Sequence, residues 1–349
     1  MPLEEDRQAI DRIDEQILSL LKERAALAKK IGEERGDNFD PARERQVLDR
    51  LQKLAASPLT REAVSAIYGE IIAQMRLLAA PIRVAYLGPE GTFNHMAAQK
   101  KFGAQADLRP VDSIPDMFSE VEKKRADCAV VPVENSTEGV VRPTLDMFVD
   151  SPLKICAEVN VEIVHHLLSN SPLKDIKRVY SMGQALGQCR QWLRQNLPNA
   201  EQIEVSSTAR ATQLASSNES AAAIASELAS ELYDVPILCR AIQDSPLNRT
   251  RFMIIGRASP APSGRDKTSI LFAVKHEAGA LYNALGAFNE HGVNLAMIES
   301  RPTKKTPWEY IFFVDCVGHQ QEPSVGAAIE ALKHHCLFVR VLGSYPEAD

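Results

Sequence analysis

The chain has 349 residues, of which 45% are hydrophobic and 25% charged, and its formal net charge is −6 at pH 7. This length is too great for one ordinary core, so we expect two or three domains. The acidic balance excludes a general attraction to nucleic acid or to an anionic membrane, and no apolar run is long enough to cross a bilayer. The polar start MPLEEDRQ and six scattered cysteines predict a cytoplasmic protein with reduced thiols, without disulfides or a zinc site.

The first 80 residues predict an all-helical domain. Apolar side chains keep helical spacing between Ile10 and Ile31, a second helix follows Asp40, and a third runs from about residue 60 to 78. Asp40 before Pro41 is typical of a helix start, because the carboxylate accepts from free backbone N–H groups and the proline needs none. The long first helix cannot bury its whole apolar stripe against two shorter ones, so we infer that two chains pair through this region.

Strand-like and helical runs alternate from Pro81 to about residue 257. The strand-like runs are IRVAYLG, ADCAVVPVEN, KICAEVNVEIVHHLL, KRVYSM, SAAAIAS and TRFMIIG, and FNHMAAQKKFG and QALGQCRQWLRQNL are helical stretches between them. This alternation predicts parallel sheets that bind ligands at their strand ends. The length of the span suits two α/β lobes around a cleft.

Three motifs place polar groups beside these strands. GPEGTF, residues 88–93, joins a strand to a helix, and its glycines suit either an anion-binding loop or a plain tight turn. VPVENSTEGVV puts polar side chains directly after a buried strand, where they face either a cleft or solvent. NRTRFMIIG places Thr250 and Arg251 at the mouth of an apolar strand, and a surface charge is the ordinary alternative for Arg251.

Residues 257–267, RASPAPSGRDK, predict a linker because they are rich in Pro, Ser and Gly. The runs that follow are TSILFAV, AGALYNALGAFNEHG, VNLAMIESRP, WEYIFFVDCV, PSVGAAIEALKHH and LFVRVLGSYP. Their order is strand, helix, strand, strand, helix, strand, which is the ferredoxin-like order. No cluster of titratable residues in this part suggests catalysis.

The motifs GPEGTF, VPVENSxEG, YSxxQALGQC and TRF occur in an order that resembles prephenate dehydratase. GALYNAL and ESRP resemble the ACT regulatory domain of the same enzymes, and the first 80 residues resemble the all-helical type of chorismate mutase. The resemblance covers essentially the whole chain, in the order of the bifunctional mutase–dehydratase of phenylalanine synthesis. It implies a mutase-like helical dimerisation domain over residues 1–80, a two-lobed α/β dehydratase domain over 82–257, similar to periplasmic binding proteins, and an α+β ferredoxin-like ACT domain over 268–349.

The resemblance further implies that prephenate is converted to phenylpyruvate, with loss of carbon dioxide and water and without a metal or organic cofactor. The key group would be the hydroxyl of Thr250, with Arg251 as the partner of a substrate carboxylate. Further hydrogen-bonding groups implied for the site are those of Thr92, Glu134, Asn135, Ser136 and Ser181. The family often has Ser-His-Pro-Gln where this chain has SMGQ at residues 181–184, so one candidate acid is missing.

For the C-terminal part, the resemblance implies a site for L-phenylalanine between paired ACT domains, in a dimer or a tetramer. The residues implied to line it are Gly279, Ala280, Leu281, Glu299, Ser300 and Arg301. Gly279 would let the ligand approach free N–H groups at a helix start. A structural ion pair is the alternative for Arg301.

For the helical part, the resemblance implies a chorismate site with Arg7 supplied by the partner chain. The local residues would be Arg24, Arg35, Asp40, Arg43 and Glu44. The match is incomplete, because Arg35 stands in place of a lysine, and Met75 and Ala79 occupy positions where the family has polar residues. We therefore expect weak mutase activity, and a fully active bifunctional enzyme is the alternative.

Two other functions fit parts of the pattern. A two-lobed α/β domain also occurs in solute-binding proteins, which capture small molecules without chemistry, and an ACT-like domain also suits an amino-acid-sensing regulator. The threonine of TRF and the polar start of the chain argue against the first. The acidic charge argues against a regulator that binds DNA.

Overall fold

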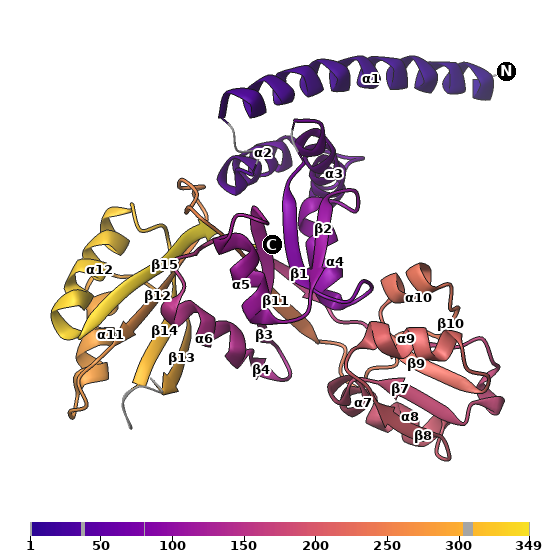
Figure 1. The fold of residues 1–349 in the computed structure, drawn as a ribbon. Coiled ribbons are helices and arrows are strands. Elements are labelled where there is room, and N and C mark those ends of the chain that lie inside the picture. Colours follow the sequence, from indigo (N-terminus) through magenta and orange to yellow (C-terminus); the bar gives the residue numbers. More distant parts are fainter. Residues whose placement is uncertain (1, 36–38, 80, 303–309, 349) are drawn as a thin grey trace.

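The protein is described by a computed structural model that covers residues 2–35, 39–79, 81–302 and 310–348. Figure 1 shows a helical part at the top, a first α/β lobe below it, a second lobe at lower right and a C-terminal sheet with two helices at the left. No helix among the described residues is both long and apolar enough to span a bilayer.

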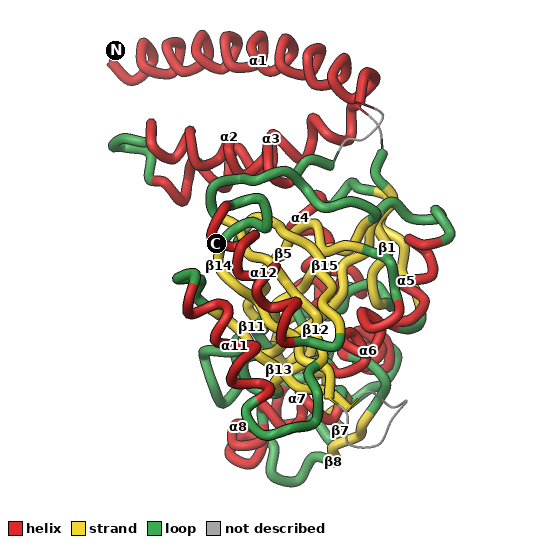
Figure 2. The backbone as a smooth tube through the Cα atoms, turned by 90° about the vertical axis from the view of Figure 1, so that its left-hand side faces the viewer, coloured by secondary structure: helices red, strands yellow, loops and turns green. Residues whose placement is uncertain are grey.

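The helical part confirms the three predicted helices, α1 (Pro2–Arg35), α2 (Pro41–Leu54) and α3 (Arg61–Ala79). Asp40 caps α2, since its Oδ1 accepts the backbone N–H of Arg43 at 2.9 Å. Figures 1 and 2 show α1 running across α2 and α3. The apolar residues of α1 are exposed within one chain, and Leu20 for example is 64% exposed.

The first lobe contains a mixed sheet in the order β2-β1-β3-β11-β5, with β4 beside β3. Its elements are β1 (Arg83–Leu87), α4 (Phe93–Phe102), β2 (Asp107–Val111), α5 (Ile114–Glu122), β3 (Cys128–Asn135), β4 (Gly139–Val140), α6 (Arg142–Asp150), β5 (Lys154–Glu162) and β11 (Arg249–Gly256). β1 runs parallel to β2 and β3, but β11 is antiparallel to both β3 and β5. The prediction of parallel sheets is therefore wrong here. The chain returns from the second lobe through β11, which inserts between β3 and β5 and runs in the direction opposite to both.

The second lobe holds a smaller mixed sheet in the order β10-β6-β9-β7-β8. Its elements are β6 (His166–Leu168), the 3-10 turn Leu173–Asp175, β7 (Arg178–Ser181), α7 (Gly183–Gln188), α8 (Arg190–Asn196), β8 (Glu201–Glu204), α9 (Thr208–Ser216), β9 (Ala221–Ala225), α10 (Glu227–Tyr233) and β10 (Ile237–Cys239). Both ends of this lobe connect to the first through β5 and β11, and the arrangement confirms the prediction of two lobes.

The C-terminal part has the predicted ferredoxin-like order. Its elements are β12 (Asp266–Ala273), α11 (Ala280–Glu290), β13 (Leu295–Pro302), β14 (Tyr310–Val317), α12 (Pro323–His335) and β15 (Phe338–Pro346), and its antiparallel sheet runs β13-β14-β12-β15. The helices α11 and α12 cover one face of the sheet, as Figure 2 shows from their side. Residues 303–309, which include the start of the predicted WEYIFFVDCV strand, lie outside the described residues.

The opposite face of the C-terminal sheet packs directly on the first lobe. Leu271, Phe313 and Leu342 share one buried core with residues of the first lobe such as Phe148 and Ile155. At Gly343 the backbones of β15 and β5 approach so closely that an added Cβ would lie 2.2 Å from the carbonyl oxygen of Ile155. The two parts therefore form one continuous body instead of hanging on a flexible linker.

Candidate active site

The cleft between the two lobes is the best candidate for an active site. It is a cavity of about 530 Å³ lined from the first lobe by the ends of β1 and β3, the starts of α4 and α6, and the start of β11. From the second lobe it is lined by α7 and by the start of α9. Polar side chains from both lobes enter it, including Thr92, Asn135, His165, Gln188 and Thr250.

The hydroxyl of Thr250 is oriented by an amide on the neighbouring strand. Asn135 Nδ2 donates to Thr250 Oγ1 at 2.8 Å and to Asn248 Oδ1 at 2.8 Å. The oxygen of Asn135 accepts three bonds from residues 137 and 138, which fixes the amide in this orientation. Because Thr250 Oγ1 accepts from Asn135, its own hydrogen can be donated to a ligand in the cleft.

This hydrogen-bond network continues across the hinge into the second lobe. Asn248 Nδ2 donates to Gln188 Oε1 at 2.8 Å, and His165 Nε2 lies 2.9 Å from the same oxygen. Gln188 Nε2 donates to Thr137 Oγ1 and to Glu138 Oε1, each at 3.1 Å. The network therefore joins the turn after β3 to α7, so its geometry depends on how the two lobes are placed.

His165 is 3% exposed and borders the cleft. Its Nε2 must carry a hydrogen to bond Gln188 Oε1, and its Nδ1 has no hydrogen-bond partner within the described part of the chain. Burial lowers the pKa of His165, so the ring is neutral near pH 7 and Nδ1 is an acceptor. Sequence reasoning missed His165, Gln188 and Asn248, because no spacing distinguishes them from ordinary strand and helix residues.

Thr92 borders the cleft, but its hydroxyl already has structural partners. It donates to the carbonyl of Leu87 at 3.1 Å and accepts from the backbone N–H of His95 at 3.3 Å, as the cap of α4. His95 does not line the cleft: its Nδ1 accepts from Gly91 N at 3.1 Å and its ring stacks on Tyr86. Gly91 has a φ of +84°, and an added Cβ would lie 3.1 Å from Tyr233, so the glycine loop is a tight turn packed against the second lobe.

Four predicted residues lie outside the lining of the cleft, namely Glu134, Ser136, Ser181 and Arg251. Ser136 directly follows β3 and donates at 2.8 Å to the carbonyl of Leu247, which precedes β11. Ser181 is 0% exposed and donates to Ile224 O at 2.7 Å. Glu134 pairs with Arg251 in the register of β3 and β11.

The position of Arg251 differs most clearly from the sequence prediction, which made it the partner of a substrate carboxylate. Its guanidinium lies in the interface with the C-terminal sheet, where Nε is 2.7 Å from Glu158 Oε2 and Nη1 is 2.6 Å from Asp315 Oδ2. Its Nη2 donates to Tyr345 Oη at 3.0 Å. Side chains alternate between the two faces of a strand, so Arg251 cannot point into the same cleft as Thr250.

The charged residues among the described lining of the cleft are Arg142 and Glu138. Arg142 opens α6, whose preceding residue, Val141, makes no side-chain cap bond. The helices α4, α6 and α9 also begin at the cleft, and free backbone N–H groups at helix starts favour anions. The cleft therefore suits an anionic ligand. No cluster of side chains that could hold a metal ion is found in the described ranges.

The structure shows what surrounds the departure from Ser-His-Pro-Gln. An added Cβ at Gly183 would lie 2.6 Å from Oε1 of Glu204, an exposed and flexible side chain that would have to shift to admit a larger residue. Met182 lines the cleft where the family often has histidine.

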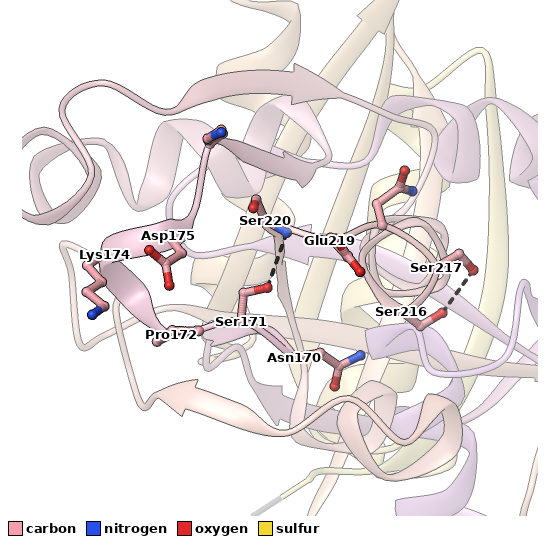
Figure 3. A pocket seen from close by; sticks show the side chains of 11 residues that line it. Asn170, Ser171, Pro172, Lys174, Asp175, Ser216, Ser217, Glu219 and Ser220 are labelled. Carbon is pink, nitrogen blue, oxygen red and sulfur yellow. Dashed lines mark hydrogen bonds between the residues drawn. The ribbon is translucent and has the colours of Figure 1, made fainter.

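A second hollow lies in the second lobe, and Figure 3 shows the side chains that line it. It measures about 650 Å³ and is lined by short polar side chains, by Pro172 and by the charged residues Lys174, Asp175, Lys177 and Glu219. Within it, Ser171 Oγ accepts from the backbone N–H of Ser220 at 3.2 Å. This hollow borders the amino ends of β7 and β9, whereas ligands of α/β sheets bind beyond the carboxyl ends.

In the C-terminal part, Ala280 and Leu281 border a hollow of about 140 Å³ with Lys275, Tyr310 and Phe312. Gly279 precedes α11 with a φ of +83°, which favours glycine.

The residues of ESRP divide between the two faces of the sheet. Ser300 pairs with Phe312 in the register of β13 and β14. Arg301 instead points to the first lobe, where Nη2 is 3.0 Å from Asp146 Oδ1, and this is the structural ion pair named as its alternative role. Side chains alternate along the strand, so Glu299 lies on the same face as Arg301 and Ser300 lies on the other.

Arg7 and Arg24, both predicted for a chorismate site, cannot meet within one chain. Arg7 and Arg24 are 17 residues apart on one helix, or about 26 Å. Arg43 is exposed and Asp40 caps α2. Glu44 pairs with Arg76 of α3 and, at 3.4 Å, with Lys101 of α4, while the side chains of Arg35 and Ala79 lie outside the described residues.

Comparison with known proteins matches all three parts. Residues 84–260 match the family described as Prephenate dehydratase, residues 6–79 match Chorismate mutase type II, and residues 268–334 match the ACT domain. A bifunctional chorismate mutase/prephenate dehydratase of Aquifex aeolicus is 50% identical and covers 99% of this chain and 98% of its own.

Two solved structures resemble most of the chain. A prephenate dehydratase from Arthrobacter aurescens in complex with L-Phe is 35% identical, with a TM-score of 0.71 over 76% of this chain and 90% of that one. A protein described as a novel type of quorum quenching acylase is 28% identical, with a TM-score of 0.70 over 75% of this chain and 97% of that one.

Proposed function

Because the chain belongs to the prephenate dehydratase family, in its bifunctional form with an N-terminal mutase domain, we propose that the cleft between the lobes is the site of dehydration. The chain is an enzyme of phenylalanine synthesis that converts prephenate to phenylpyruvate. This excludes the alternatives of a solute-binding module and of a regulator without catalysis.

The hydroxyl of Thr250 is the proposed catalytic donor, and its geometry is the observation that carries the proposal. The reaction expels carbon dioxide from one carbon of the ring and hydroxide from another, and the ring becomes aromatic. Negative charge grows on the departing oxygen, where a positioned donor stabilises the transition state. Asn135 makes Thr250 Oγ1 an acceptor, which leaves the hydroxyl hydrogen available for donation to the ligand.

The other cleft residues bind and orient the dianion in this proposal. Arg142 and the starts of α6 and α9 attract the carboxylates. The neutral Nδ1 of His165 accepts a hydrogen bond, for which the substrate hydroxyl is a suitable donor. Thr92 contributes as the helix cap that shapes the cleft. The strands are supported by Ser136, Ser181 and Glu134. Arg251 has a separate role in the interface with the C-terminal domain.

The test is a direct assay. The purified chain is incubated with prephenate, and phenylpyruvate is followed for the parent protein and for Thr250→Val. Turnover by the parent and its loss in the variant support the site, whereas turnover that survives in the variant would place the donor elsewhere.

The regulatory proposal concerns the C-terminal domain, residues 268–349. The hollow at Ala280 and Leu281 would bind L-phenylalanine, and the L-Phe complex of the Arthrobacter relative supports this choice of effector. A hollow of about 140 Å³ is small, which is consistent with a site completed by a second ACT domain.

We also propose a cytoplasmic homo-oligomer in which the exposed apolar residues of α1 pair with a second chain. The separation of Arg7 from Arg24 supports a mutase site that takes Arg7 from the partner. The domain limits proposed are residues 1–80, 82–257 and 268–349. Mutase turnover is proposed to be weak, because Glu44 is paired with Arg76 and Lys101.

A further inference from the structure

The strand β11 carries two adjacent residues that serve different parts of the molecule. Thr250 borders the cleft between the lobes. Arg251 points through the other face of the sheet into the interface with the C-terminal domain, where its side chain is 14% exposed. A displacement of one residue along this strand therefore moves the other.

Arg251 is held by groups from three strands of two domains. Glu158 of β5 bonds its Nε, while Asp315 of β14 and Tyr345 of β15 bond its two terminal nitrogens. Lys267 of β12 bonds the second oxygen of Glu158 at 3.0 Å, and Ser269 Oγ donates to Asp315. Two buried carboxylates thus face two cations, and the guanidinium is fixed by three directional contacts.

The charges in this cluster are stable in the folded chain. Burial favours the neutral form of Arg251, but Tyr345, Asp315 and Glu158 outweigh it and raise the pKa of the guanidinium. Burial likewise favours protonated Glu158, but Arg251 and Lys267 outweigh it and lower the pKa of that carboxyl. Removal of one partner therefore leaves a buried charge without compensation, and its neighbours must move.

The strand β14 links this cluster to the proposed effector site. Tyr310 and Phe312 of β14 border the hollow on the helical side of the C-terminal sheet. Asp315, three residues after Phe312, lies on the side that faces the first lobe and bonds Arg251. One short strand thus contacts the hollow on one face and the guanidinium beside Thr250 on the other.

We propose that Arg251 is a positioning residue, whose ion pair with Asp315 sets the place of the Thr250 hydroxyl and makes it depend on the state of the C-terminal domain. The inference rests on the proposed roles of Thr250 and of the effector hollow. Catalytic geometry is sensitive to small shifts, since a displacement of about 1 Å can cost roughly a hundredfold in rate. An effector that displaces β14 would thereby lower turnover without entering the cleft.

The first experiment removes the charge of Asp315 with little change of volume. Asp315→Asn in the full chain should lower kcat by about tenfold with KM within about threefold, because substrate contacts remain while the donor is misplaced. The concentration of L-phenylalanine that halves turnover should rise by about tenfold, since the two sites are then less coupled. In a Thr250→Val background the same change should lower kcat by less than about twofold, because both act through one group.

Asp146→Asn is the matched control. It removes an ion pair from the same interface, the pair with Arg301, but does not touch β11. Its kcat should stay within about twofold of the parent, as for ordinary interface substitutions. If Asp315→Asn does not fold, the variant Tyr345→Phe tests the inference instead, because it removes one hydrogen bond to Arg251 and keeps the charges. It should lower kcat by about threefold, the value of a modest hydrogen bond.

The inference is overturned if the folded Asp315→Asn or Tyr345→Phe protein keeps both kcat and inhibition within twofold of the parent. It is also overturned if Asp315→Asn lowers kcat equally in the parent and in the Thr250→Val background. These outcomes differ from failure of the proposed function, in which Thr250→Val itself would retain turnover.

Discussion

Replacement of Thr250 by valine tests the proposed chemistry with little change of shape. Valine keeps the branched side chain and removes the oxygen that accepts from Asn135 at 2.8 Å and that would donate to the leaving group. Asn135 Nδ2 keeps its bond to Asn248 Oδ1, so the amide does not lose every partner. The stability cost should therefore be about 1 kcal/mol, the net value of one hydrogen bond.

The effect on rate should be much larger than the effect on stability. Loss of one donor to a developing oxyanion typically lowers kcat by about 10²–10³, or roughly 3–4 kcal/mol. KM should change less than about threefold, because the carboxylates are bound by other groups. Stopped assays of phenylpyruvate under saturating prephenate, with urea unfolding of the same samples, separate the two effects.

Ser136→Ala provides the contrast, because it removes a hydroxyl from the adjacent turn that bonds Leu247 O and lies outside the cleft. It should lower stability by about 1 kcal/mol and leave kcat within about twofold. If Thr250→Val turned over prephenate within about tenfold of the parent, the hydroxyl would not be the main donor and the reasoning from its geometry would be refuted. An equal loss in both variants would point to a general disturbance of β3 and β11 instead.

Four further outcomes are expected. Arg142→Gln should raise KM for prephenate by about tenfold with kcat within about threefold, since a cleft cation binds substrate and transition state alike, and a large fall in kcat with unchanged KM would contradict this. Burial lowers the pKa of His95, so at acidic pH the unfolded chain binds a proton that the folded chain does not. The free energy of unfolding should therefore fall as the pH drops below about 6.5. In urea titrations, His95→Asn should reduce the slope of this free energy against pH by up to about 1.4 kcal/mol per pH unit. A chain that ends at Ser263 lacks the C-terminal side of the core shared with the first lobe, so it should unfold at lower urea than the parent, whereas an unchanged midpoint would show that the lobe is independent. Chorismate turnover by the full chain should be far below the several per second of an ordinary enzyme, and a rate of about 10 per second would contradict the weak mutase activity expected from Arg35, Met75 and Ala79.

Most elements of the fold could be predicted from the sequence because their periodicity is strong. The three N-terminal helices and the βαββαβ order carry long apolar patterns, and the N-cap at Asp40 was predicted from its neighbour Pro41. The strands missed are short and polar, such as β8 with the sequence EQIE. The direction of β11 could not be predicted, because local pattern does not say between which strands a returning segment inserts.

The candidate site was predicted in part. Thr92, Asn135 and Thr250 line the cleft, since the strand ends and helix starts that carry them converge there. Burial of Ser181 and the position of Arg251 depend on which face of a strand another layer covers, and neither is visible in a single segment. Which face is covered depends on how whole domains pack together. The position of His165 at the cleft depends on this packing too.

The tripeptide Thr250-Arg251-Phe252 shows why a motif can be recognised correctly while one of its residues is misassigned. Alternation along a strand sends Thr250 and Phe252 to the cleft and Arg251 to the opposite face. A catalytic reading of all three residues assumes that a motif serves one site. Here the opposite face is covered by a second domain, and the arginine in the middle is the contact to it. In the proposed mechanism the motif therefore combines a hydroxyl for chemistry with a charge that ties this hydroxyl to the C-terminal sheet, and we expect a substitution at Arg251 to lower turnover without any contact between that residue and the substrate.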